Sequence, residues 1–160
     1  MVEERVRFGD FEADFMIGSK TGCPLLVLTD RARMYTNIKK LPANEATQVV
    51  EAIIEIIQKI YPQMVQTMTF DNGLELVKHG RIKPLFGVET YVTRPYKGTV
   101  ENRIGVLQRR FFKGKSINQC TDQQIQIIED KMNNRGVRQL EYLSSVEKIN
   151  ATWDHVALAS

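Results

Sequence analysis

The stretch MTFDNGLEL, residues 68–76, decides how the chain should be folded. An Asn-Gly pair between two alternating strands is a strong β-hairpin signal, and Asn72-Gly73 follows an apolar, β-prone run. The apolar residues between positions 74 and 82 do not alternate, however, so the return strand of a hairpin is missing. We therefore predict a strand that stops at Asp71 and breaks into a loop or a helix start. Isolated Asp-Asn-Gly sequences are usually turns, but strand ends are also where α/β folds place their ligands.

Hydrophobic periodicity outlines the other elements of the chain. In residues 8–18, Phe11, Ala13, Phe15 and Ile17 share one face of a strand, and Asp10, Glu12 and Asp14 share the other. In chain order we expect that strand, two strands within 23–41 around a turn at Asp30-Arg31, a helix at 43–62, strands at 65–70 and 88–94, and helices at 99–113, 121–134 and 144–153. The residues Asn44, Thr99 and Thr121 are the expected N-caps.

A three-stranded meander that continues into a βαβ unit predicts an α/β fold. Its mixed five-stranded sheet would consist of a three-strand antiparallel meander plus two parallel strands, flanked by helices. The length of 160 residues suits one domain, 1–160, and 42% hydrophobic with 26% charged residues is typical of a soluble globular protein. We expect no membrane partner, because no apolar run approaches the roughly 20 residues of a membrane helix.

The net charge and the cysteines bear on the possible partners of the protein and on its redox compartment. The net charge of +3 permits a nucleic-acid partner without requiring one. Cys23 and Cys120 lie far apart without metal-ligand spacing, which indicates free thiols in a reducing compartment.

Three acids fall at element ends or on a polar strand face: Asp14, Asp71 and Glu101. Mg²⁺ prefers oxygen ligands and typically takes one or two protein carboxylates per ion. Two such ions about 4 Å apart can clamp the attacking and leaving oxygens of a phosphoryl displacement, with Asp71 as the shared ligand. If the strand register differs from the one expected, Asp10 or Glu12 would replace Asp14.

The segment 94–115 is cationic, with seven Lys and Arg residues against the single acid Glu101. Such residues are either solvated or contact DNA phosphates, in a salt-sensitive and sequence-independent way. Asn72 and Asn102 follow two of the acids and are candidates for orienting the ligands. The candidate DNA-binding residues are Lys97, Arg103, Arg109, Arg110, Lys113 and Lys115.

Four blocks carry a family resemblance: GDFEADFMIG (9–18), LLVLTDRARMY (25–35), TMTFDNGLELVKH (67–79) and GTVENRIGVLQRRFFKGK (98–115). In this order they resemble the catalytic core of DDE transposases of the retroviral-integrase superfamily, and most closely the insertion-sequence-thirty type of bacterial transposase. The resemblance implies an RNase H-like fold in which Asp14, Asp71 and Glu101 are the first, second and third catalytic acids.

The same resemblance implies the chemistry and the partners. It predicts two Mg²⁺ (or Mn²⁺) ions that support phosphodiester hydrolysis and strand transfer in DNA transposition. The expected partners are DNA, as transposon ends and target DNA, and further copies of the chain in a homo-oligomer. The expected location is the bacterial cytoplasm. We also expect the N-terminal module that binds the DNA ends to lie outside this sequence.

Some positions depart from the family pattern. Phe11 replaces a Trp, Gly136 and Ser145 replace prolines, and the loop before Glu101 is about four residues short, through a real deletion or through missing residues. The short loop and Gly136 keep open one alternative, a decayed or repurposed non-catalytic nucleic-acid-binding module. A second alternative is an RNase H-like nuclease that acts on RNA–DNA hybrids.

Overall fold

The computed structural model describes residues 7–17, 22–42, 46–60, 64–71, 81–93 and 98–159; for residues 46, 71, 92–93 and 155–159 it describes the backbone alone. The strands are β1 (Asp10–Met16), β2 (Leu25–Asp30), β3 (Thr36–Lys40), β4 (Thr67–Asp71) and β5 (Glu89–Thr93). The helices are α1 (Ala46–Lys59), α2 (Ile82–Phe86), α3 (Thr99–Val106), α4 (Asp122–Asn133) and α5 (Ser145–Ala159), with a π-helix, η4 (Leu107–Phe111), and short 3₁₀ turns η5 (Ile117–Gln119) and η6 (Arg138–Leu140). Among the described helices, none is long and apolar enough to cross a membrane.

The five strands form one mixed sheet in the order β3-β2-β1-β4-β5. The pairs β1–β2 and β2–β3 are antiparallel, whereas β4 pairs in parallel with both β1 and β5. A parallel neighbour requires a crossover connection, and α1 supplies it between β3 and β4. The predicted fold class, a meander plus two parallel strands flanked by helices, is confirmed.

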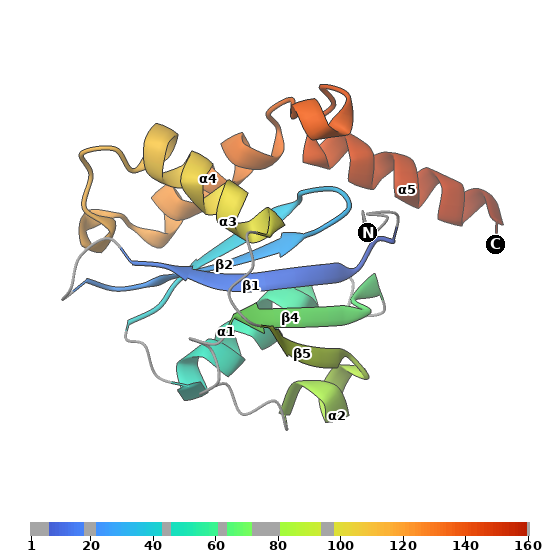
Figure 1. Ribbon diagram of the computed structural model, residues 1–160, viewed down its shortest axis with the longest axis horizontal. Helices are drawn as coiled ribbons and strands as arrows, with labels where there is room; N and C mark the ends of the chain where they lie inside the picture. The colour runs from blue at the N-terminus through green and yellow to red at the C-terminus, as the bar shows by residue number, and fades with distance from the viewer. Residues whose placement is uncertain are drawn as a thin grey trace.

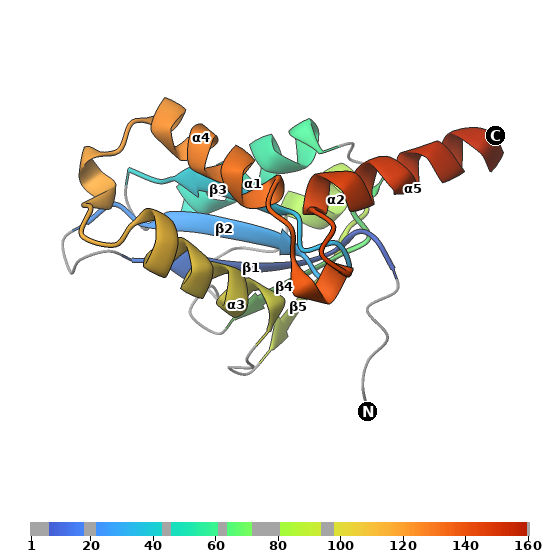
Figure 2. The same cartoon turned by 90° about the horizontal axis from the view of Figure 1, so that it is seen from above.

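The sheet separates two apolar layers, because alternate residues of each strand point to opposite faces. On one face, Phe11 and Ala13 of β1 join the buried side of α1. On the other, Met16 of β1 and Val27 of β2 pack under α3 and α4. Figure 1 shows α1 on one side of the sheet and α3 and α4 on the opposite side, and both Figure 1 and Figure 2 show α5 extending away from the body.

The β3 edge of the sheet is covered by α4. An uncovered edge strand would leave backbone donors and acceptors free to pair with another chain. The Asn133 side chain instead accepts from the Thr36 backbone N–H at 2.8 Å and donates to the Thr36 carbonyl at 2.7 Å. Glu129 accepts from the Ile38 backbone N–H at 2.7 Å. Side chains of α4 therefore supply hydrogen-bond partners to this edge at Thr36 and Ile38.

Several element ends differ from the prediction. β1 stops at Met16, which is buried under α3, so Ile17 lies beyond the strand and is 56% exposed. The Thr121 cap is confirmed, with a full capping box to Gln124. The final helix continues to residue 159, beyond the expected end at 153. The predicted Asn44 cap lies outside the described residues.

Glu129 makes the stability of this edge depend on pH. Burial raises the pKa of Glu129, and the Ile38 N–H only partly offsets that effect. The folded chain thus holds the Glu129 proton more tightly than the unfolded chain, so stability falls as the pH rises from the ordinary glutamate value of about 4.3 through the folded pKa. Glu129→Gln keeps an acceptor for Ile38 but cannot ionise. In urea titrations we expect the difference in the free energy of unfolding, variant minus wild type, to be more positive at pH 7 than at pH 4.

The exposed acid Glu51 on α1 provides the matched control. Glu51→Gln should shift the unfolding free energy equally little at both pH values. An identical pH dependence for Glu129→Gln and wild type would contradict the assigned cause.

Candidate active site

The first two predicted acids lie at the same end of neighbouring parallel strands. Ala13 of β1 pairs with Phe70 of β4, so the next residues, Asp14 and Asp71, are adjacent in the sheet. Asp14 is half-buried on the face covered by α3, and its Oδ1 accepts the Phe15 backbone N–H at 2.7 Å. β4 ends at Asp71, as the sequence predicts. The backbone thus brings two carboxylate positions to one strand end, where α/β sheets hold their ligands.

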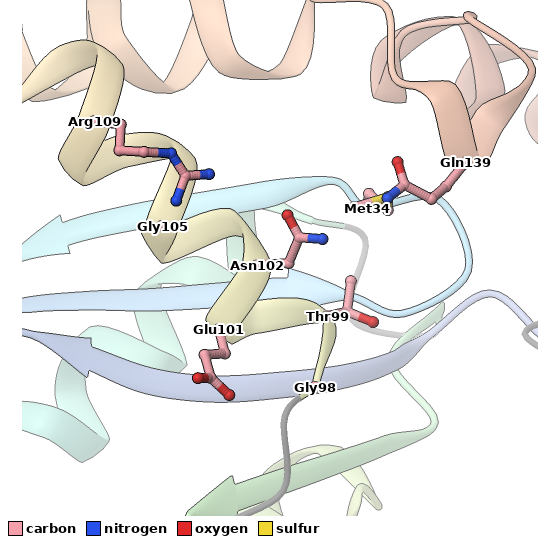
Figure 3. A pocket seen from close by; sticks show the side chains of 8 residues that line it. All are labelled: Met34, Gly98, Thr99, Glu101, Asn102, Gly105, Arg109 and Gln139. Atoms are coloured by element: carbon pink, nitrogen blue, oxygen red, sulfur yellow. The ribbon is translucent and has the colours of Figure 1, made fainter.

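Glu101 comes from the first turn of α3 and is exposed. Val100 and Ile104 are buried under the helix and fix it against the sheet. α3 packs across β1 and β2, and Figure 3 shows Glu101 pointing over β1.

The structure does not by itself establish a metal centre. Within the described part of the chain, no three acidic, histidine or cysteine side chains gather closely enough to hold an ion. The Asp71 carboxylate and all of Asn72 lie outside the described residues. The three-acid ligand set therefore remains a prediction, supported by the backbone positions of Asp14, Asp71 and Glu101.

A hollow of about 510 Å³ adjoins Glu101, between α3, the β2–β3 turn and η6. In Figure 3 the Asn102 amide faces Gln139 and Met34, whereas Glu101 points to the opposite side. Arg109 folds back along the helix, so that a Cβ added to Gly105 would lie 3.0 Å from its guanidinium. The lining residues are Met34, Gly98, Thr99, Glu101, Asn102, Gly105, Arg109 and Gln139. Sequence reasoning missed Met34 and Gln139, because nothing local marks a turn and a 3₁₀ segment as neighbours of α3.

Four of the predicted DNA-binding residues are exposed: Arg109, Arg110, Lys113 and Lys115. They follow one another along η4 and the turn after it, on the continuation of the helix that carries Glu101. The expected helix at 99–113 therefore changes to π geometry at Leu107, and such changes are frequent near functional sites. Lys97 lies outside the described residues.

Arg103 requires a correction, because it is only 4% exposed and cannot serve as a surface contact for DNA. Its Nε donates to Thr36 Oγ1 at 2.9 Å, and a terminal nitrogen donates to the Met132 carbonyl at 3.3 Å. Burial, with a smaller effect of Arg135, lowers the pKa of Arg103 to about 10, so it stays charged at neutral pH. Arg103 ties α3 to β3 and to the end of α4.

The predicted Thr99 cap is also wrong, because the N-cap of α3 is Gly98 and Thr99 is a buried residue inside the first turn.

The two acids that could replace Asp14 as a metal ligand, Asp10 and Glu12, have other partners. Asp10 accepts from Arg7 at 2.6 Å and from Thr67 at 2.7 Å. Burial alone would raise the pKa of Asp10, but these hydrogen bonds outweigh it and the pKa is lowered. Glu12 contacts the backbone of α3. The register therefore favours Asp14 as the first acid.

The chain is similar in sequence to several bacterial transposases. The chain is 36% identical over 152 residues to the transposase for insertion sequence element IS4351 of Bacteroides fragilis, covering 92% of this chain and 46% of the relative. It is 32% identical to a probable transposase for the insertion-like sequence element IS1161 of Streptococcus salivarius, covering 94% and 44%. It is 26% identical to the transposase InsI for element IS30A of Escherichia coli K12, covering 92% and 39%. No family model matches the chain.

Solved structures share the fold. The catalytic core domain of BIV integrase superposes with a TM-score of 0.64 at 16% identity, covering 94% of this chain and 98% of that one. A chain from the simian T-cell lymphotropic virus intasome in complex with PP2A regulatory subunit B56 gamma gives a TM-score of 0.71 at 14% identity, covering 88% and 54%.

The mixed five-stranded sheet with its flanking helices thus has the fold found in retroviral integrase catalytic cores, which is RNase H-like. The chain is related over nearly its whole length to the transposases of bacterial insertion sequences, including the insertion-sequence-thirty type. It spans about half the length of the curated relatives that it matches. The predicted resemblance is confirmed.

The role of Arg103 in tying α3 to β3 and α4 can be tested by measuring the free energy of unfolding. Arg103→Ala removes a buried side chain and the donors to Thr36 and Met132, so we expect it to lower the free energy of unfolding by about 2–3 kcal/mol in urea titrations. Arg110→Ala, at an exposed position of the same helical segment, should change it by less than about 0.5 kcal/mol. Equal stability of the two variants would show that Arg103 is not a buried tie.

Proposed function

We propose that this chain is the catalytic core of a DNA transposase, which hydrolyses phosphodiesters and transfers DNA strands with two Mg²⁺ or Mn²⁺ ions. The observation that carries the proposal is the juxtaposition of Asp14 and Asp71 on parallel strands beneath the helix that presents Glu101. The homology to transposases supports the same activity. Because the chain spans about half of those relatives, the activity and partners of a complete protein are part of the proposal.

The donor chemistry fits the proposed ions. The three positions provide only carboxylate oxygens, which hard divalent cations prefer. Asp14 and Asp71 would hold one ion, Asp71 and Glu101 the other, and Asn72 would orient these ligands. Asn102 is predicted from the sequence to share that role, but its amide faces Gln139 and Met34, away from Glu101 (Figure 3). Such ions, when bound, activate the attacking oxygen and stabilise the leaving oxygen of an in-line displacement.

Other groups of the chain would hold the catalytic acids and the DNA strand in position. Asp14 is constrained by the strand and by the Phe15 N–H, and Glu101 by the buried side of α3. Arg109 and Gln139 line the hollow beside Glu101, where donors of this kind suit the phosphates of a DNA strand. The exposed residues Arg110, Lys113 and Lys115, together with Lys97, would extend that contact. Water or a DNA 3′-hydroxyl is then held for attack without a covalent protein intermediate.

Two further expectations rest on the homology alone. Joining two transposon ends to a target requires more than one core, so we expect a homo-oligomer on DNA. We also expect the protein to act in the bacterial cytoplasm.

The three acids are tested by neutral substitutions. In a plasmid nicking assay with Mg²⁺ or Mn²⁺, Asp14→Asn, Asp71→Asn and Glu101→Gln should each lower the rate at least about a thousandfold, equivalent to about 4 kcal/mol. Thermal unfolding should stay close to wild type, because a neutral amide replaces each carboxylate at similar size. Glu51→Gln, on the opposite face of the sheet, should remain active. Retained nicking in Asp71→Asn would refute the assignment, and cleavage restricted to RNA–DNA hybrids would favour the nuclease alternative.

The basic segment is tested by the salt dependence of DNA binding. Each lost phosphate contact should reduce the slope of log affinity against log salt by about 0.9. Replacing Arg109, Arg110, Lys113 and Lys115 together by alanine should therefore flatten the slope by about 2–4, measured by fluorescence anisotropy with duplex DNA. Lys83→Ala serves as the control, because Lys83 lies on α2 in a surface ion pair with Glu89 of β5. An unchanged slope in the fourfold variant would place the DNA elsewhere.

A further inference from the structure

Glu12 is a buried acid that local sequence does not explain. It lies on β1, on the same face as Asp14, and the residue is only 9% exposed. Removing a carboxylate from water is costly unless hydrogen bonds and opposite charge compensate it. Both of its oxygens have such partners, and neither partner is a neighbour in sequence.

One Glu12 oxygen contacts the start of α3. Oε2 accepts the Val100 backbone N–H at 2.9 Å, in a buried hydrogen bond between residues 88 positions apart. Val100 is the second residue of α3, whose N–H has no partner within a helix and is ordinarily bonded by the N-cap side chain. The N-cap of α3 is Gly98, which has no side chain to offer. Glu12 therefore caps α3 from the sheet, and its negative charge suits the positive end of the helix dipole.

The other Glu12 oxygen pairs with Arg31. Oε1 lies 3.0 Å from Arg31 Nε, in the turn between β2 and β3. The carboxylate thus accepts a hydrogen bond at Oε2 from a helix start and forms an ion pair at Oε1 with a turn. That arrangement makes Glu12 a poor metal ligand and a well-restrained support.

Gly98 is shaped to this contact. A Cβ at position 98 would come within 2.5 Å of Glu12 Oε2. Its φ of −93° is open to any residue, so backbone strain does not explain the glycine. The need for a glycine comes from the close approach of the Glu12 carboxylate.

The contact forms a short link between two proposed catalytic acids. Glu12 and Asp14 are two residues apart on one strand, a span of about 6.8 Å. Val100 immediately precedes Glu101. One buried hydrogen bond therefore connects the strand that carries Asp14 to the helical turn that carries Glu101.

We propose that Glu12 is a positioning residue, whose carboxylate, seated against Gly98, sets the placement of Glu101 relative to Asp14. The inference rests on the proposed function in so far as Asp14 and Glu101 bind metal. A salt bridge in the interior seldom adds net stability compared with apolar packing. Net stability therefore does not explain why the Glu12 carboxylate is buried. Positioning the first turn of α3 does explain it.

The contact is tested first without activity. In the ¹⁵N-labelled chain, Glu12→Ala should speed hydrogen exchange of the Val100 amide about tenfold or more, because its acceptor is lost. Glu12→Gln keeps an acceptor oxygen and should show a smaller effect. Glu55→Gln, which removes an exposed partner of Lys39, is the matched control and should leave Val100 unchanged. Unaltered exchange at Val100 in Glu12→Ala would overturn the proposal.

Positioning is tested by Mn²⁺ binding, followed as paramagnetic broadening of amide signals near Asp14 and Glu101. Loss of a group that orients metal ligands typically costs 10–100-fold in affinity. We expect a loss in that range for Glu12→Ala and a smaller one for Glu12→Gln, with the fold retained. Unchanged Mn²⁺ affinity in a folded Glu12→Ala would overturn the positioning role, as would the absence of Mn²⁺ binding by wild type.

A double-mutant cycle with Gly98→Ala tests whether the two residues act through one contact. Gly98→Ala by itself serves as the test if Glu12→Ala fails to fold. Gly98→Ala alone should weaken Mn²⁺ binding as Glu12→Ala does, because the new Cβ displaces the carboxylate. In the Glu12→Ala background the same change should have little further effect, so the two losses are not additive. Additive losses would overturn the proposal. Normal Mn²⁺ behaviour without DNA nicking by wild type would instead refute the proposed function and leave the role of Glu12 intact.

Discussion

The parallel pairing of β1 with β4 sets the position of nearly everything else in this molecule. Two parallel neighbours need a long crossover, and β3 and α1 complete it before the chain returns as β4. The pairing also aligns the two strands so that Asp14 and Asp71 arrive at one end of the sheet. A one-residue slip of β1 would turn its acids toward α1 and its phenylalanines toward α3. The apolar layers on both faces therefore hold the register that brings the acids together.

The layer above the acids is unusual in that buried charges hold α3. Glu12 reaches its first turn from the sheet, and Arg103 reaches from its middle to β3 and α4. Glu101 lies between these two anchors and is itself exposed. A helix held only by apolar contacts can slide or rotate with little loss of buried area, whereas a directional hydrogen bond at each anchor opposes both motions. The arrangement suits the proposed role of Glu101, in which its carboxylate meets Asp14 and Asp71 at a fixed separation.

The side of the sheet that carries α3 and α4 contains both buried groups that hold the fold and exposed groups beside Glu101. α4 supplies hydrogen-bond partners to β3, and the hollow beside Glu101 opens between α3 and η6. Exposed basic residues continue along the helix from that hollow. Groups that stabilise the core are thus buried or paired, and groups available to a nucleic-acid strand remain at the surface. Arg103 and Arg109, both within the cationic segment, fall on opposite sides of this division.

Local sequence determined the strands, the main helices, the end of β4 at Asp71 and the acidic face of β1. These features follow from periodicity and from turn chemistry, which act over a few residues. Only the tertiary structure decided that Glu12 caps α3, that Arg103 is buried, and that Gly98 rather than Thr99 begins the helix. Alternation assigns a residue to a face of its strand, but the element that covers that face comes from a distant part of the chain. Glu12 and Val100 are 88 positions apart, which is the reason that no local pattern could reveal their contact.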